Sequence, residues 1–95
     1  VGGGRGIGRA IAEGYRRHGS RVAVFDRDFP HELHNDIYTD IVDIGSLQLI
    51  EEGVNRFYKE FKSVDILVNC AGITIPNKTH NYDYSDWQKT MDINI

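Results

Sequence analysis

The stretch VGGGRGIGRAIAEGYRRHGS, residues 1–20, has glycines at positions 2, 3, 4, 6 and 8 that lead into an amphipathic segment. From Gly6 to His18 the apolar residues recur at intervals of three and four, which predicts a helix that ends at Gly19. The unpaired amides at a helix N-terminus attract anions, and glycines leave the approach to them open. The alternative is a flexible terminal linker. We expect a phosphate site that includes Gly2, Gly4, Gly6 and Gly8.

Three short apolar stretches beyond this loop predict buried strands. They are RVAVFDRD at 21–28, IYTDIVD at 37–43 and VDILVNCAG at 64–72. The first two are separated by a loop at 28–36 that contains a proline and has no clear period.

Two further helices are predicted between and after these strands. A stripe of large apolar side chains with a Ser46 or Asp43 cap indicates a helix packed on one face; the stripe is Leu47, Ile50, Val54, Phe57 and Phe61. A polar loop from residue 73 to 84 leads to a last helix that starts from a Ser85 cap. Strands that alternate with helices predict an α/β fold, with a parallel sheet covered on both faces.

Composition narrows the class of protein. The 95 residues predict one domain, 1–95, or part of one. A net charge of -3, with 11 basic and 14 acidic residues and no basic block, argues against a nucleic-acid partner. No apolar stretch is long enough for a membrane span or resembles a secretory signal. A single cysteine, Cys70, fits a reducing compartment, so we expect a cytoplasmic protein.

An acidic residue ends the first predicted strand. Asp26 follows Gly6 by 20 residues, the separation at which dinucleotide-binding folds place an acid on the adenosine ribose hydroxyls. The alternative is an ordinary carboxylate in a turn. A carboxylate here would repel a 2′-phosphate, which favours NAD over NADP.

Two motifs in this order resemble a known family. GGGRGIG at residues 2–8 and DILVNCAGI at 65–73 are similar to the glycine motif and the N-N-A-G segment of short-chain dehydrogenases/reductases. The resemblance covers essentially the whole chain and implies a Rossmann-type, doubly wound parallel sheet that binds NAD(P). Because the glycine loop of that family follows a strand, we expect the sheet to be incomplete, with its first strand and C-terminal half outside residues 1–95.

The resemblance implies a role for each residue that matches a family motif. Gly2, Gly6 and Gly8 would be the motif glycines, with Arg5 and Ile7 at the pyrophosphate, Asp26 at the ribose, Asp40 at the adenine amino group and Ile41 beneath the ring. Asn69, Ala71 and Gly72 would line the cofactor, and Asn94 would belong to the catalytic tetrad of Asn, Ser, Tyr and Lys. Arg27, like Arg5, is a basic residue of the kind that accompanies NADP in the family, yet the Asp26 charge should outweigh both.

The chain departs from the family pattern at two positions. Val1 stands where the family usually has Thr, and Cys70 replaces the second Asn. A single cysteine at the end of a buried strand is more often a small core residue than a nucleophile.

The resemblance implies an oxidoreductase that interconverts an alcohol and a ketone or aldehyde, in a parent protein that is a homodimer or homotetramer. Tyr58 and Lys62 have the Y-x-x-x-K spacing but precede DILVNCAG, so we expect the tetrad Ser, Tyr and Lys beyond Ile95. No metal site is expected, since His31 and His34 lack a partner set. Two alternatives stay open: a non-catalytic dinucleotide sensor and an S-adenosylmethionine-dependent methyltransferase.

Overall fold

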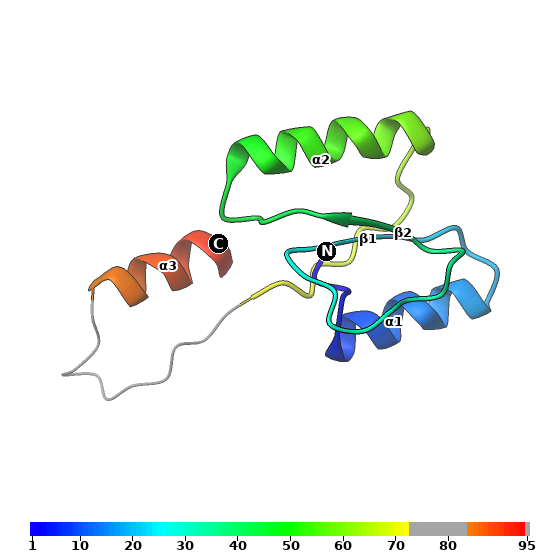
Figure 1. Ribbon diagram of the computed structural model, residues 1–95, viewed down its shortest axis with the longest axis horizontal. Helices are drawn as coiled ribbons and strands as arrows, with labels where there is room; N and C mark the ends of the chain where they lie inside the picture. Colours follow the sequence, from blue (N-terminus) through cyan, green and yellow to red (C-terminus); the bar gives the residue numbers. More distant parts are fainter. Residues whose placement is uncertain (73–83, 95) are drawn as a thin grey trace.

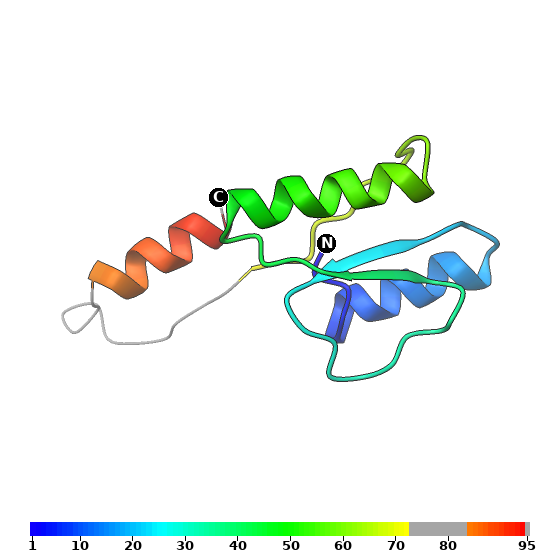
Figure 2. The same ribbon diagram turned by 45° about the horizontal axis from the view of Figure 1, so that its top comes forward.

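The structure is a computed structural model that describes residues 1–72 and 84–94. Its elements follow in the order α1 (Gly6–Arg17), β1 (Ala23–Asp26), β2 (Tyr38–Ile41), α2 (Leu47–Glu60) and α3 (Tyr84–Asn94). The strands β1 and β2 pair in parallel, with Phe25 opposite Asp40. Helices α1 and α2 lie on opposite faces of this pair (Figures 1 and 2). The predicted parallel sheet with helices on both faces is therefore confirmed.

Neighbouring residues of β1 pack on the two different helices. Val24 is buried in one cluster with Ala12 of α1 and with Ile37. The ring of Phe25 meets the ring of Phe57 of α2 edge-on, with centroids 6.3 Å apart. Because side chains alternate between the faces of a strand, this short strand holds both helices in place.

The first helix ends as its sequence predicts. Gly19 adopts a φ of +92°, in the left-handed region. Its backbone nitrogen donates to the Arg16 carbonyl at 3.0 Å, and that of Ser20 donates to the Tyr15 carbonyl at 3.0 Å. These bonds satisfy carbonyls that the end of the helix would otherwise leave unpaired.

Helix α2 confirms one expectation and corrects another. Of the two candidate caps, Ser46 accepts a hydrogen bond from the Leu49 nitrogen at 3.3 Å and is the N-cap. The predicted apolar stripe is wrong in part, since Leu47 and Val54 are exposed by 72% and 37%. Gly53 is buried instead, next to the side chains of Val42 and Phe25. Helical spacing alone could not show that the smallest residue sets the inward face.

The third predicted strand, at 64–72, is a correction. The structure assigns no strand there, and Ile66 and Leu67 are exposed. The segment is joined to Val1, whose nitrogen donates to the Val68 carbonyl and whose carbonyl accepts from the Cys70 nitrogen, both at 2.8 Å. One paired residue neither forms a ladder nor buries an apolar run, so the high β propensity of the sequence does not lead to a strand.

Helix α3 also differs from the prediction at its start. It begins at Tyr84, so Ser85 lies in its first turn rather than at the N-cap. None of its residues is buried. The loop predicted at 73–84 lies outside the described residues except for Tyr84. Among residues 1–72 and 84–94, no helix has both the length and the apolar character that crossing a bilayer requires.

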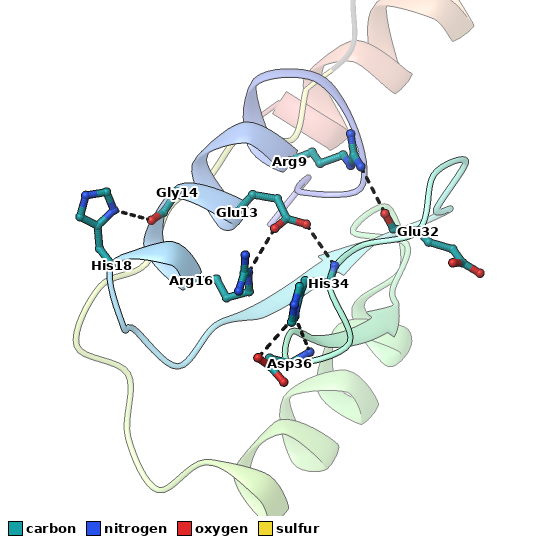
Figure 3. A network of polar contacts seen from close by, with 8 residues as sticks. All are labelled: Arg9, Glu13, Gly14, Arg16, His18, Glu32, His34 and Asp36. Carbon is teal, nitrogen blue, oxygen red and sulfur yellow. Dashed lines mark hydrogen bonds and ion pairs between the residues drawn. The ribbon is translucent and has the colours of Figure 1, made fainter.

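The connection between β1 and β2 is fastened to α1 by polar contacts (Figure 3). Glu13 accepts from the His34 backbone nitrogen at 3.1 Å and from Arg16 at 3.3 Å. Arg9 donates to the Glu32 carbonyl at 3.2 Å. Within the same connection, the Asp36 backbone nitrogen donates a hydrogen bond to Nδ1 of His34 at 3.1 Å. Residues without regular structure are thus held against the first helix.

Candidate functional site

One cavity of about 480 Å³ lies where the glycine loop meets the ends of the strands. Eight of its lining residues belong to the predicted site: Gly2, Arg5, Ile7, Gly8, Asp26, Arg27, Ala71 and Gly72. The others are Val42, Asp43, Ile44, Cys70 and Ile93. Residues from both halves of the chain therefore form this cavity.

The start of α1 is open to an anion. Arg5 is its N-cap residue and makes no side-chain capping bond, and no acidic residue lies in the first turn. The first backbone bond into the helix is that from the Arg9 nitrogen to the Arg5 carbonyl, at 3.2 Å. Helix α2, in contrast, is capped by Ser46. The amide groups at the start of α1 can therefore bind a negatively charged ligand.

At two glycines of this loop the backbone of another segment approaches too closely to leave room for a side chain. A Cβ on Gly2 would lie 2.6 Å from the Ala71 nitrogen, and one on Gly8 would collide with the Gly2 carbonyl. Gly6 has a φ of +59°, and none of the atoms in residues 1–72 and 84–94 would lie within 4 Å of a Cβ added to it. Side chains at Gly2 and Gly8 would force apart the loop, the helix and the segment at 70–72. The glycines thus form a tight backbone cradle.

Asp26 is held at the end of β1 by two backbone groups. Its Oδ2 accepts from the Gly4 nitrogen at 2.8 Å, and its Oδ1 accepts from the Arg27 nitrogen at 2.7 Å. A carboxylate oxygen has room for more than one donor, so both atoms can still accept hydroxyl groups of a ligand. Gly4 does not line the cavity itself but orients the carboxylate that does.

Asp40 and Ile41 are not among the residues that line the cavity. The Asp40 carboxylate accepts two hydrogen bonds from Arg56 of α2, at 2.7 and 3.0 Å. This hydrogen-bonded pairing raises the pKa of Arg56. Asp40 is opposite Phe25 in the parallel register, and Phe25 faces α2, so Asp40 is on the same face. Ile41 is exposed by 67%.

The segment at 69–72 and the end of α3 meet at the edge of the cavity. Asn69 does not line it, but its Oδ1 accepts from the Ala71 nitrogen at 3.1 Å and shapes the turn. Asn94 does not line it either; a Cβ on Gly72 would lie 3.2 Å from its Oδ1. Gly6 also lies outside the lining, although its neighbours on both sides belong to it.

Sequence reasoning missed the residues that follow β2. Val42 is buried, and Asp43 turns its carboxylate to the Gly45 nitrogen at 2.9 Å. Parallel strands bring their carboxyl ends to one edge of a sheet, so the residues after β2 could have been expected beside Asp26. The expectation that Cys70 is a core residue is wrong, since it is exposed and lines the cavity. It is exposed because 64–72 is not a buried strand.

Comparison with known proteins identifies the class. The family model described as short chain dehydrogenase matches residues 1–95. The 2,3-dihydro-2,3-dihydroxybenzoate dehydrogenase of Escherichia coli (strain K12) is 32% identical over 95 residues, which are 100% of this chain and 38% of the relative. The chain thus spans about two fifths of the length of the curated relatives it matches.

Solved structures agree with this result. A short chain dehydrogenase from Leptospira borgpetersenii with bound NAD+ superposes with a TM-score of 0.90 and 26% identity, over 99% of this chain and 38% of that one. ElxO with bound NADP gives a TM-score of 0.87 and 27% identity, over 100% and 42%. Fold and cavity therefore define a Rossmann-type α/β protein. The chain belongs to the short chain dehydrogenase family.

Proposed function

We propose that this chain binds NAD through the cavity between the glycine loop, Asp26 and residues 70–72, as part of an oxidoreductase that interconverts an alcohol and a ketone or aldehyde. The observation that carries the proposal is that the uncapped start of α1 and the Asp26 carboxylate lie on the same cavity. Arg5 and Ile7 line it at the start of the helix, and Asp26 lines it at the end of β1. A diphosphate suits the open amides, and ribose hydroxyls suit the carboxylate.

The residues present fit a dinucleotide on three grounds. Side chains at Gly2 and Gly8 would destroy the cradle, as the close backbone contacts show. Asp26 is oriented by two amides and cannot swing aside to admit a 2′-phosphate without losing both hydrogen bonds. Arg27 supplies positive charge at the same cavity. The two solved relatives, one bound to NAD+ and one to NADP, support a nicotinamide dinucleotide.

A bound nicotinamide dinucleotide would donate a hydride to the carbonyl carbon of a ketone or aldehyde, or accept one from the carbinol carbon of an alcohol. The described residues would bind this dinucleotide and orient it in the cavity. The start of α1 would hold the diphosphate, Asp26 the ribose hydroxyls, and the turn at Ala71 and Gly72 the far side of the cavity. Asn94 lies against Gly72 and would position groups of the proton-transfer machinery next to this turn.

Calorimetric titration of the full natural protein with NAD+, NADP+ and S-adenosylmethionine tests the proposal. We expect NAD+ to bind more tightly than the other two ligands. Asp26→Asn should lower the preference for NAD+ over NADP+ by about tenfold, because the repulsion of a 2′-phosphate is lost. Glu51→Gln, which removes the same charge from an exposed position on α2, should leave the preference unchanged. The proposal would be overturned if S-adenosylmethionine bound more tightly than NAD+, or if the protein bound neither NAD+ nor NADP+.

A further inference from the structure

An ion pair joins the glycine loop to the residues after β1. Nη2 of Arg5 lies 3.5 Å from Oδ1 of Asp28, and about half of each side chain is exposed. Arg5 lines the cavity, whereas Asp28 does not. The cation of the loop is thus directed toward an acid that stands outside the cavity.

Backbone contacts fix the place of Asp28. A Cβ on Gly4 would lie 2.6 Å from the Asp28 carbonyl oxygen and 2.8 Å from Oδ2 of Asp26. The Gly4 nitrogen also donates to Oδ2 of Asp26. Residues 26–28 therefore wrap closely around Gly4, the neighbour of Arg5. The ion pair rests on this close backbone packing and not on two free surface side chains alone.

The pair changes the charge that a ligand would meet. Arg5, Arg27 and Asp26 line the same cavity, two cations and one anion. Asp28 balances the second cation from outside. A 2′-phosphate would carry nearly two negative charges to the carboxylate of Asp26, and a free guanidinium at Arg5 would be its natural partner.

We propose that Asp28 is a positioning residue that holds and neutralises Arg5, and so makes the cavity select the dinucleotide without a 2′-phosphate. This inference rests on the proposed function but goes beyond it. Asp26 rejects the phosphate by direct repulsion, while Asp28 acts through Arg5 by withholding a cation. The two acids therefore contribute separately to one preference.

The test measures Kd for NAD+ and NADP+ with the full natural protein and four variants: Asp28→Asn, Arg5→Gln, the double variant and Asp36→Asn. Asp28→Asn should raise the affinity for NADP+ relative to NAD+ by about three- to fivefold, the effect of one half-exposed charge. The gain should disappear in the Arg5→Gln background and shrink at high salt. Asp36→Asn removes the same charge from the same connection, where Asp36 contacts His34, and should change nothing.

The outcomes separate the two proposals. If wild-type protein prefers NAD+ but Asp28→Asn leaves the affinity ratio unchanged, or changes it equally without Arg5, this inference alone is overturned. Should Asp28→Asn unfold, Arg5→Gln in the wild-type background still decides: a large change in the ratio would show that Arg5 was not neutralised. Wild-type protein that binds neither dinucleotide overturns the proposed function and this inference with it.

Discussion

The carboxylate of Asp26 accepts a hydrogen bond from the Gly4 nitrogen at 2.8 Å, across 22 residues of sequence. This bond joins the end of β1 to the loop that starts α1. The acid and the open amide groups, which would contact different parts of a ligand, are therefore fixed relative to each other. The site depends on backbone proximity as much as on side-chain chemistry.

Gly8→Ala tests the cradle. Its Cβ would collide with the Gly2 carbonyl and push the start of α1 away from the loop. We expect binding of NAD+ to weaken by at least about tenfold, equivalent to roughly 1.4 kcal/mol, because the amides no longer converge on the diphosphate. Titration calorimetry of the full natural protein measures this effect.

Gly14→Ala is the matched control on the same helix. A Cβ there would lie 3.9 Å from Arg17 Nη2, an ordinary contact. Its binding constant should equal that of the wild type, and its stability should rise by about 0.5–1 kcal/mol from better helix propensity. If Gly8→Ala and Gly14→Ala bound NAD+ equally well, binding would not depend on the close approach of Gly8 to the Gly2 carbonyl.

Gly53→Ala should destabilise the protein although alanine is the better helix former. The added Cβ would lie 2.6 Å from Val42 Cγ2, and a β-branched side chain has no easy alternative rotamer. We expect a loss of about 1–3 kcal/mol in the free energy of unfolding, measured by denaturant titration. A gain in stability like that of Gly14→Ala would contradict the close packing of Gly53 on Val42, the residue that follows β2.

Glu13 should make stability depend on pH. The hydrogen bond from the His34 backbone nitrogen, with help from Arg16, lowers the pKa of Glu13 below its ordinary value of 4.5. The unfolded chain then binds the proton more readily, so the stabilisation is present above pH 4.5 and is lost as the pH falls through the lowered native pKa.

Glu13→Gln should lower the Tm by about 1–3 °C at neutral pH and by less in acid. Thermal unfolding of the full natural protein at about pH 7 and about pH 3.5 checks the difference. Glu51→Gln, on the exposed side of α2, serves as control and should show no such convergence. A deficit for Glu13→Gln that is equal at both pH values would rule out this ionisation as its cause.

Local sequence patterns predicted the elements whose backbone hydrogen bonds are completed by residues nearby in the sequence. Helix α1 ends at Gly19 because a left-handed glycine closes it, and Ser46 caps α2 because its hydroxyl reaches a nearby amide. The segment at 64–72 failed this test. Its apolar run indicated a strand, but a strand needs a neighbour, and the described partner is Val1.

The site shows the same division. The glycine loop and Asp26 could be read as parts of one site, because their types and spacing are restricted by ligand chemistry. The contact of Asp40 with Arg56 could not be read, since it depends on which face of β2 meets α2. Nor could the lining by Ile93, which comes from the distant helix α3.

The sequence by itself determined the order of α1, β1, β2 and α2, the end of α1, the start of α2, the glycine loop and the acid that follows it, because short-range chemistry sets each of these. Only the tertiary structure decided that Gly53 faces inward, that Asp40 pairs with α2 and that Arg5 points to Asp28. These relationships depend on packing distances and charge pairs between segments far apart in the chain. No local spacing carries that information.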